Sequence, residues 1–482
     1  MEASKKSLKK NYQPSFKGLR VVLKSKVKKS TLLSLDLAKT TKVQDIHIQI
    51  NDFLSRQLKP NQQLLLGLSG GLDSCVLLHL LSAFKQTIPF NLLAMHVHHG
   101  LSANADAWAE FCLQQCALLN VPLEIVHISI EKDTKLGIEG AARQLRYEAL
   151  FSYKLDEVPV DYIVTAHHQD DQAETLLLQL FRGSGIKGLA SMAAVDNARR
   201  LLRPLLNISR SQLQDYAELQ GIQWCEDESN TDTHYDRNFV RHEVLPILEA
   251  RYPAVKSVLA RSALHLAEAN ELLDALAAID AEQLISSNSI CLIGLAKLEF
   301  SRAKNVLRWW FAKNYLSMPS AEYLSQIISQ LLNAKADANI HIVLQHLVLK
   351  KFQKKAYLLQ EKSQQAFDMI WNGEAALMLP NGGQLFFKQV TGSGLALKFG
   401  MTKLRITSRD GGERFKPNVL RPTRTLKHLL QEASIPPWQR EYLPLIYWHD
   451  TLACVPGIGI SHELQAVGDE LGIEIVWQDE LL

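Results

Sequence analysis

The chain has few cysteines and no long hydrophobic segment. Its six cysteines are spread over 482 residues, and no two of them form a Cys-x-x-Cys pair. We therefore expect no disulfide framework, no structural zinc site and no cysteine-held iron–sulfur cluster. No run approaches the roughly 18 apolar residues that a membrane-spanning helix needs. These absences favour a soluble, reduced, cytoplasmic protein that does not associate with a membrane.

The net charge is small, but the charged residues are unevenly distributed. The whole chain carries a formal +3, while residues 1–42 hold twelve basic and two acidic residues. The other 440 residues hold 41 basic and 48 acidic residues, so the folded part is acidic. Residues 1–45 are predicted to form a basic, disordered arm without the apolar core of a signal peptide. Electrostatic attraction to a polyanion is the alternative role for this arm.

From about residue 64, segments of strand and helix pattern alternate. One helical segment has Leu72, Val76, Leu80 and Phe84 on one face. The strand-like apolar runs are Leu64–Leu68, Leu92–Val97, Leu123–Ile128 and Tyr162–Ala166. This alternation predicts βαβ units and a parallel sheet covered by helices on both faces. The first folded domain is therefore predicted to be α/β and to span residues 46–252.

The second half of the chain is predicted to contain two smaller domains. Leu and Ala recur three and four residues apart over 254–335, which predicts a helical domain over 253–375. Gly-containing turns and β-prone runs predict a small α+β domain over 376–482. Residues 301–360 hold nine basic and two acidic residues, and 401–442 hold nine basic and four acidic. These stretches favour nucleic-acid binding, with an ordinary solvated surface as the alternative.

The strongest local signal is the hexapeptide Ser69–Ser74, with the sequence Ser-Gly-Gly-Leu-Asp-Ser, directly after the first predicted strand. Two glycines allow a sharp turn that points backbone N–H groups at an anion, and the following helix N-terminus adds partial positive charge. The serine hydroxyls could donate to phosphate, and Asp73 could hold Mg²⁺. Because no Gly-Lys-Ser/Thr is present, this is not a Walker-type loop. The alternative is an ordinary Gly-Gly turn before a capped helix.

Polar clusters also follow two other predicted strands. His98 and His99 come after Leu92–Val97, and a run of polar residues at 167–175 comes after Tyr162–Ala166. In an open parallel sheet, ligands bind outside the carboxyl ends of the strands. The three clusters, far apart in sequence, are therefore predicted to meet in one crevice.

The polar run 167–175 contains an acidic pair at a predicted helix start. Asp171 and Glu174 are three residues apart, so both carboxylates can face the crevice and bind a cationic amine or a metal. An acidic helix cap is the alternative for this pair. A zinc site made by His167, His168 and Asp171 is a weaker alternative, because the neighbouring hexapeptide points to phosphate chemistry.

Two further glycine-containing segments flank the predicted crevice. Gly137–Arg143 opens the helix after the third strand, and Arg143 could reach a phosphate as a guanidinium. Arg146 could do the same or pair with a glutamate on its own helix. Arg182–Gly188 has three glycines in seven residues and is predicted to be a loop that closes over the site, or a plain connecting turn.

Taken together, these segments resemble the tRNA(Ile)-lysidine synthase family of the PP-loop ATP pyrophosphatase superfamily. The resemblance covers roughly residues 60–460 and leaves out the basic arm. Besides Ser69–Ser74, it rests on His96–Leu101, Gly137–Arg143, Thr165–Thr175, Arg182–Leu189, Asp227–Arg241, Gly411–Phe415 and Ile435–Arg440.

The resemblance implies an architecture and a reaction. Residues 46–252 would form a PP-loop ATP-binding catalytic domain, and residues 253–375 and 376–482 would bind tRNA. The substrate would be tRNA(Ile) with a CAU anticodon, whose wobble cytidine is adenylated by ATP with release of pyrophosphate. Free L-lysine would then displace AMP and form lysidine, so that the anticodon reads AUA instead of AUG.

The resemblance and the chemistry of the residues together assign roles in the site. Asp73, Arg143 and His167 are expected to be catalytic, with Mg²⁺ at Asp73. Asp171 and Glu174 are expected to hold lysine. The residues expected to bind ATP are Ser69, Gly70, Gly71, Leu72, Asp73 and Ser74. The sequence leaves open a homodimer, the tRNA bases that are read outside the anticodon, and the group that deprotonates the lysine amine.

Three other functions would each fit part of the sequence. The basic arm and basic stretches would also suit an RNA-binding protein whose ATP loop is structural or regulatory. A synthetase of the amidotransferase type acting on a small molecule is disfavoured because no glutaminase domain is evident. Cytidine thiolation by a related enzyme is disfavoured because the Cys-x-x-Cys cysteines of that enzyme are absent here.

Overall fold

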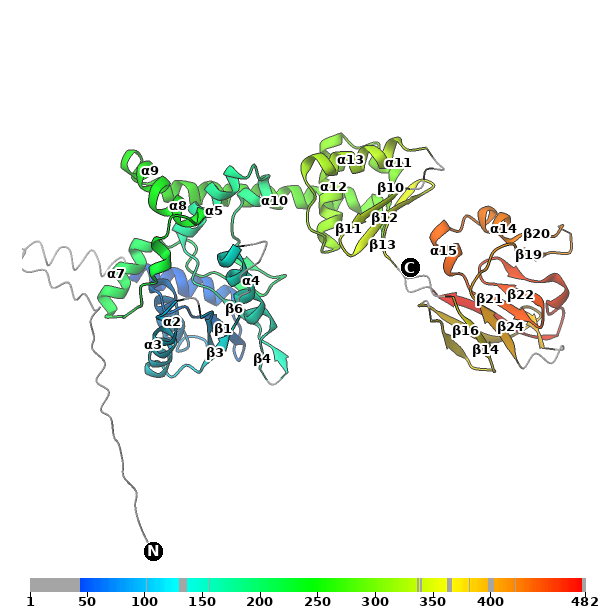
Figure 1. The fold of residues 1–482 in the computed structure, drawn as a ribbon, viewed down its shortest axis with the longest axis horizontal. Helices are drawn as coiled ribbons and strands as arrows, with labels where there is room; N and C mark the ends of the chain where they lie inside the picture. The colour runs from blue at the N-terminus through cyan, green and yellow to red at the C-terminus, as the bar shows by residue number, and fades with distance from the viewer. Residues whose placement is uncertain are drawn as a thin grey trace, which may run out of the picture. The chain divides into compact units, whose positions relative to one another are not determined.

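The computed structural model describes residues 44–478 except 101, 130–136, 156, 336, 337, 339, 362–365, 381, 398–402 and 421. The side chains of 137–139, 229 and 230 are likewise outside the description. The basic arm lies outside the described residues except for positions 44 and 45, which begin a helix over 44–57. The chain divides into two units, Met1–Asn270 and Glu271–Leu482 (Figure 1).

The first unit is built around a six-stranded sheet with the order β3-β2-β1-β6-β8-β7. All neighbouring pairs are parallel except β7 with β8. Strands β1, β2, β3 and β6 coincide with the four predicted apolar runs. The strands are β1 (Gln63–Gly67), β2 (Asn91–His98), β3 (Leu123–His127), β6 (Tyr162–Val164), β7 (Val195–Asp196) and β8 (Leu201–Leu202).

Helices cover both faces of this sheet, as alternate residues of β1 demonstrate. Leu64 and Leu66 are buried in a core shared with the 44–57 helix, α2 (Leu72–Phe84), α3 (Ala105–Leu118) and α7 (Arg210–Gln220). Leu65 belongs to a separate core that contains Leu150 of α4 (Gly137–Ser152). Successive strand residues point to opposite faces, so the predicted doubly covered α/β domain is confirmed.

Three polar segments lie at one edge of this sheet. Because β1, β2 and β6 are parallel, their carboxyl ends at Gly67, His98 and Val164 face the same way. Four residues separate the end of β1 from helix α2, and helix α5 (Gln169–Phe181) begins shortly after β6. The residues between each strand and the helix that follows it therefore line one crevice, at the carboxyl ends of the strands, as predicted.

After the sheet, the chain of the first unit continues through short helical pieces into a long helix. These pieces are a 3₁₀ turn (Glu228–Thr231), α8 (Asp236–Phe239), a π-helical turn (Val240–Val244) and α9 (Leu245–Arg251). Helix α10 (Val255–Leu284) follows and crosses the division between the two units. Within the described residues no helix, α10 included, combines the length and apolar character that crossing a bilayer requires.

The predicted helical region continues through α11 (Leu292–Leu295), α12 (Phe300–Lys313) and α13 (Ala321–Asn333). It also contains a five-stranded antiparallel sheet of order β11-β12-β13-β10-β9, which the helical periodicity did not predict. Trp310, Phe311 and Ile327 of the helices pack in one core with Leu349 and Leu358 of this sheet. The strands are β9 (Ile285–Ser286), β10 (Ser289–Cys291), β11 (His341–Leu344), β12 (Leu347–Phe352) and β13 (Lys355–Gln360).

The last part of the second unit is rich in strands. One sheet has the order β14-β18-β21-β22-β23 and another has the order β15-β16-β24-β17. Their apolar residues meet in a shared core, and helices α14 (Leu426–Glu432) and α15 (Pro437–Tyr442) complete this α+β region. The strands of the two sheets are β14 (Asp368–Trp371), β15 (Ala376–Met378), β16 (Gln384–Thr391), β17 (Leu395–Ala396), β18 (Leu404–Thr407), β21 (Leu445–Trp448), β22 (Thr451–Val455), β23 (Gly459–Ile460) and β24 (Leu471–Gln478).

Candidate active site

The loop Ser69–Ser74 has a backbone that requires glycine at its second position. Gly70 has φ +83°, a left-handed conformation, and an added Cβ would lie 3.1 Å from Cys112 Sγ. The carbonyl of Gly70 accepts a hydrogen bond of 2.9 Å from the backbone N–H of Cys225. The loop is thus fixed from behind by neighbouring segments, and its other side stays available to a ligand.

The two serines of this loop are oriented by each other and by the backbone. Ser69 Oγ lies 3.1 Å from Ser74 Oγ, and the Ser74 hydroxyl also donates to the carbonyl of Gly71 at 3.0 Å. Gly71 is the extended residue that precedes helix α2. The first-turn N–H groups of a helix have no partner within that helix, so this end of α2 can bind an anion, as the sequence predicted.

Two cavities open at this edge of the sheet and meet at Ser69, Asp73 and Asp227. The first, here called the histidine cavity, has a volume of about 210 Å³; its polar lining includes Ser69, Asp73, Ser74, His96, His98, His99, Arg143, Arg146, Tyr147, Thr165, His167 and Asp227. The second, here called the acidic cavity, has a volume of about 460 Å³; its lining includes Ser69, Asp73, His168, Asp170, Asp171, Glu174, Arg210, Asp227, Arg241 and Lys256.

In the histidine cavity, the predicted catalytic residues His167 and Arg143 are brought together. His167 Nδ1 lies 2.9 Å from Thr165 Oγ1, and burial lowers the pKa of His167 to about 3, although Asp171 opposes this shift. The ring is therefore neutral at physiological pH. Arg143 is exposed, and its guanidinium lies 5.3 Å from the centre of the Tyr147 ring. The cavity thus offers a neutral hydrogen-bonding ring and a cation, which suits a phosphate-containing ligand.

Asp73 lies in the first turn of α2 and lines both cavities. Its Oδ1 is buried and has no hydrogen-bond partner among the described residues, whereas Oδ2 lies 3.5 Å from His168 Nε2. Among the described residues, no group of three or more His, Cys, Asp or Glu side chains is arranged to hold a metal ion. Mg²⁺ that arrives with a nucleotide needs only one or two carboxylates, because phosphate oxygens and water complete its shell. The free Oδ1 of Asp73 fits that requirement.

In the acidic cavity, the predicted pair Asp171 and Glu174 is already bound by two arginines. Both carboxylates are buried in the first part of α5. Arg237 donates to Asp171 at 2.7 Å and to Glu174 at 2.8 Å. Arg241 donates to the two oxygens of Glu174 at 2.6 and 2.9 Å, and its Nη2 lies 3.5 Å from Asp171 Oδ1. Although burial opposes the charge of each group, His168 and Arg237 lower the pKa of Asp171, and the two carboxylates raise the pKa of both arginines.

Sequence analysis missed these two arginines as site residues. Arg237 lies in α8 and Arg241 in the π-helical turn, and they are four residues apart. Both arginines belong to the segment Asp227–Arg241, on which the family resemblance partly rests. Their spacing of four residues in that segment could have indicated that they face the same site. A π-helical turn frequently marks a functional position in a helix.

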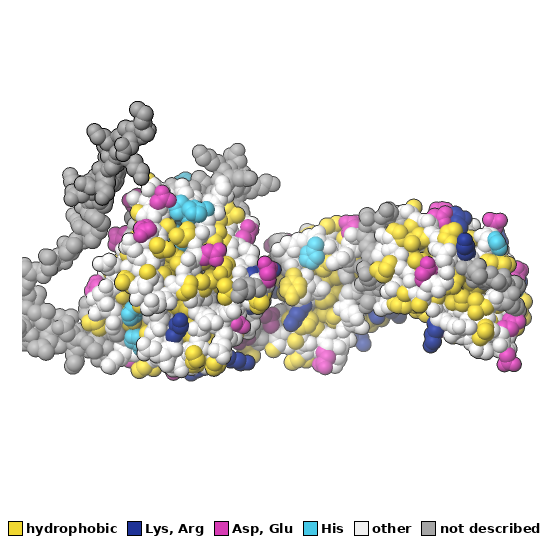
Figure 2. Space-filling view, turned by 90° about the horizontal axis from the view of Figure 1, so that it is seen from below, with side chains coloured by type: hydrophobic (Ala, Val, Ile, Leu, Met, Phe, Trp, Pro, Cys, Tyr) yellow, Lys and Arg dark blue, Asp and Glu magenta, His cyan; other side chains and the backbone are white. Residues whose placement is uncertain are grey.

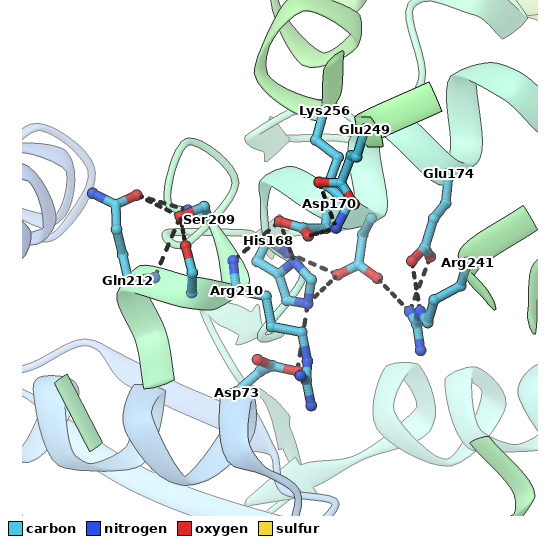
Figure 3. A network of polar contacts seen from close by, with 12 residues as sticks. Asp73, His168, Asp170, Glu174, Ser209, Arg210, Gln212, Arg241, Glu249 and Lys256 are labelled. Carbon is cyan, nitrogen blue, oxygen red and sulfur yellow. Dashed lines mark hydrogen bonds and ion pairs between the residues drawn. The ribbon is translucent and has the colours of Figure 1, made fainter. Parts of the chain in front are cut away.

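His168, adjacent to His167, faces the acidic cavity instead of the histidine cavity. Only 2% of this residue is exposed, and its Nε2 lies 3.5 Å from both Asp73 Oδ2 and Asp171 Oδ2. Burial opposes a positive charge on the ring, but the surrounding aspartates outweigh burial and raise the pKa of His168. Figure 3 shows this ring between Asp73 and the start of α5.

A second ion-pair cluster, also missed by sequence analysis, borders the acidic cavity. Lys256 Nζ of α10 lies 3.0 Å from Asp170 Oδ2 and 3.1 Å from Glu249 Oε1. The other oxygen of Asp170 accepts a hydrogen bond of 3.0 Å from the backbone N–H of Arg210 (Figure 3). The first turns of α5, α7 and α10 are thus joined through one buried carboxylate.

Comparisons with known proteins identify the family. A PP-loop domain model matches residues 42–248, a TilS substrate binding domain model matches 290–357, and a TilS substrate C-terminal domain model matches 404–477. The tRNA(Ile)-lysidine synthase of Nitrosomonas europaea is 41% identical over 433 residues, which cover 88% of this chain and 93% of that protein. The chain belongs to the tRNA(Ile)-lysidine synthase family. The family members of Azoarcus sp. and Serratia proteamaculans are each 39% identical, over 87% and 89% of this chain and over 92% and 99% of theirs.

The family resemblance predicted from the sequence is thereby confirmed. The PP-loop domain match spans the doubly covered sheet and all the predicted site residues, and it includes the lining of both cavities except Lys256. The loop Arg182–Gly188 leads into the short helix α6 (Ile186–Leu189) and lines neither cavity, and Arg182 lies 3.8 Å from the exposed Asp236. Its predicted closure over the site stays a prediction.

The basic stretches overlap the two TilS domain matches, which include all their basic residues except Lys403, and part of their charge is already paired. On α12, Lys304 lies 4.9 Å from the centre of the exposed Phe300 ring, and Lys313 lies 5.3 Å from that of Trp309. Several arginines instead bind acidic neighbours, namely Arg302 with Asp280, Arg405 with Asp368, Arg409 with Glu413 and Arg424 with Glu432. On the face drawn in Figure 2, Lys and Arg of the described residues are scattered rather than gathered in one patch.

Proposed function

We propose that this protein is an ATP-dependent ligase that joins lysine to the wobble cytidine of tRNA(Ile) with a CAU anticodon. Cytidine is first adenylated by ATP, with release of pyrophosphate, and lysine then displaces AMP to give lysidine. The modified anticodon reads AUA instead of AUG. The observation that carries the proposal is that the histidine cavity meets the acidic cavity at Asp73, in a chain of the lysidine synthase family.

The first step fits the histidine cavity. The carbonyl oxygen of cytosine attacks the α-phosphorus of ATP, and the bond from that phosphorus to the bridging oxygen of pyrophosphate breaks. The N-terminus of α2 and Arg143 are placed to stabilise the charge that develops on the phosphate. His167 Nδ1 is engaged with Thr165, so Nε2 is the ring nitrogen free to act on the ligand. A neutral imidazole there donates one hydrogen bond without adding a charge.

Mg²⁺ bound with ATP would be held by Asp73 through its free Oδ1. Such an ion neutralises phosphate charge and favours departure of pyrophosphate. Asp73 itself brings the phosphate region next to the acidic cavity, because its side chain lines both cavities.

The second step fits the acidic cavity. An amine of lysine attacks the adenylated ring carbon, the bond from that carbon to the AMP oxygen breaks, and the amine loses a proton. Asp171 and Glu174 suit an ammonium group, but Arg237 and Arg241 now hold them. Lysine binding is therefore an exchange of cations, and a released guanidinium is at hand for the α-carboxylate of the same lysine. Such an exchange selects a ligand that carries both charges.

The test is a reaction with labelled lysine, ATP, Mg²⁺ and an isoleucine tRNA transcript with a CAU anticodon. We expect pyrophosphate release and lysine incorporation that both require the tRNA. The matched control is the same transcript with uridine at the wobble position, which should take up no lysine. Consumption of ATP with another acceptor, without labelled tRNA, would contradict the proposal. Salt-dependent tRNA binding without turnover would instead support the RNA-binding alternative.

A further inference from the structure

His168 joins two side chains that belong to different halves of the site. Asp73 follows β1 and lies in the first turn of α2, whereas Asp171 lies in the first turn of α5. The ring of His168 lies between them, with Nε2 at 3.5 Å from an oxygen of each.

The side chain of His168 belongs to the capping box of helix α5, but that cap does not account for the contact of its ring with Asp73. The backbone N–H of His168 already donates to Asp171 Oδ2 at 2.9 Å, which serves the beginning of the helix. The contact from the ring to Asp73 reaches a separate helix, 95 positions earlier in the chain, and is additional to this cap. At 3.5 Å, Nε2 is at the outer limit of a hydrogen bond to each carboxylate. A shift toward one aspartate therefore lengthens the contact with the other.

We infer that His168 is a positioning residue that couples the two half-reactions of the site. This inference rests on the proposed function. Its ring fixes the position of Asp73, on the phosphate side, relative to Asp171, on the lysine side. The adenylated cytidine is then formed where the lysine amine can reach it before water does. His167, the adjacent residue, lies in the other cavity and acts on the first half-reaction alone.

The coupling is measured as the ratio of pyrophosphate released to lysidine formed in one reaction mixture. We expect a ratio of one for the wild type, since each turnover gives one of each. In His168→Leu the adenylated tRNA should be lost to water more often, so the ratio should rise at least about threefold, since small misplacements of reacting groups are costly. His168→Gln keeps a donor N–H near the position of Nε2 and should restore a ratio close to one.

His79→Gln is the matched control, because His79 lies on the same helix as Asp73 but bonds to Tyr216 at 2.9 Å, away from both cavities. Its ratio should stay at one. A merely structural role of His168 would lower both products together and leave the ratio unchanged. A ratio of one in His168→Leu, or equal ratios in the Leu and Gln variants, overturns the inference.

A variant that does not fold needs a second measurement. If His168→Leu is unfolded, the ratio is measured for His168→Asn and His168→Gln, each alone and combined with Asp171→Asn. The inference expects the His168 substitution to change the ratio less when Asp171 has already been replaced. Independent, multiplying effects would overturn it. Failure of the proposed function is distinct, because wild-type protein would then form no lysidine at all.

Discussion

The histidine cavity and the acidic cavity share one edge of the sheet but are prepared for ligands in opposite ways. In the histidine cavity, His167 is neutral, Arg143 is exposed, and Asp73 has an oxygen without a partner. In the acidic cavity, Asp170, Asp171 and Glu174 are already in ion pairs with basic side chains, and the side chain of Glu174 is only 1% exposed. The histidine cavity can bind a ligand at positions that no protein group occupies. In the acidic cavity, a cationic ligand must instead displace the protein's own cations.

This difference has a physical cause in the cost of burying charge. A buried carboxylate without a counter-charge costs several kcal/mol, so the pair Asp171 and Glu174 needs cations in the absence of lysine. The N-terminus of α2 carries only partial charge, and its N–H groups can be satisfied by water until a phosphate arrives. The four predictions below test this contrast.

The largest effect is expected at the residue that both cavities share. Asp73→Asn removes the charge of the free oxygen and should lower tRNA-dependent pyrophosphate release by about 10³-fold, in the range found when a key electrostatic group is removed. Pyrophosphate release is measured in single turnover. Asp52→Asn, on the exposed face of the 44–57 helix, is the control and should behave as wild type. Retention of more than a tenth of the rate would place the phosphate elsewhere.

The second prediction concerns the exchange of cations in the acidic cavity. Arg241→Met leaves Glu174 with one guanidinium and should lower the free energy of unfolding by about 3 kcal/mol, as for other broken buried ion pairs. Added free lysine should raise the melting temperature more in this variant than in wild type, because the ammonium can fill the vacated position. Norleucine, which lacks the ε-amine, is the control ligand. Equal responses to lysine and norleucine would argue against an ammonium site at Glu174.

The third prediction concerns the neutral state of His167. The folded state keeps this ring unprotonated down to about pH 3, whereas an unfolded chain protonates it below its ordinary pKa of 6.5. The unfolded state therefore binds one more proton, and stability falls with decreasing pH by about 1.4 kcal/mol per unit between these values. His167→Gln should remove this contribution, so urea denaturation of both proteins at about pH 4 to 5.5, where the unfolded ring is protonated and the folded ring is not, should show slopes that differ by this amount. Parallel slopes would mean that the folded protein charges His167.

The smallest effect is expected for the ion pairs of Lys256, which are partly open to solvent. Lys256→Gln should lower the free energy of unfolding by less than about 1 kcal/mol, because screened pairs contribute little. The Michaelis constant for lysine should fall modestly, since Asp170 would then add an uncompensated negative charge beside Asp171 and attract the ammonium group. The control for a lost ion pair is Arg302→Gln, because Arg302 of α12 pairs with Asp280 near the C-terminal end of α10. If Lys256→Gln lowered the free energy of unfolding as much as Arg241→Met does, the expected order of the two effects would be wrong.

The histidine cavity could be predicted from the sequence because it follows from topology. Parallel strands bring their carboxyl ends to one edge, so Ser69–Ser74 and His167 had to be neighbours once the βαβ pattern was recognised. The type of each residue then suggested its chemistry. The structure agrees in placing Asp73, Arg143 and His167 around one cavity.

The acidic cavity and the second unit were less predictable, for local reasons. Arg237 and Arg241 reach Glu174 across more than 60 residues, and no periodic pattern signals such a contact. In the sheet β11-β12-β13-β10-β9, the hairpin turns that follow β11 and β12 begin at Gln345 and Gln353, which have φ +57° and +52°. Asparagine or glycine usually marks a two-residue hairpin turn of this kind. Glutamine gave no such signal, so helical periodicity dominated the prediction.

The π-helical turn Val240–Val244 has a consequence for how this segment tolerates change in length. A π turn is an α-helix with one residue inserted, and each residue of an α-helix advances by about 100°. Deleting one residue between Arg237 and Arg241 would make the helix more regular while turning Arg241 away from Glu174. A more ideal helix would then be a worse binding site, so insertions and deletions here should be selected against even where they improve local geometry.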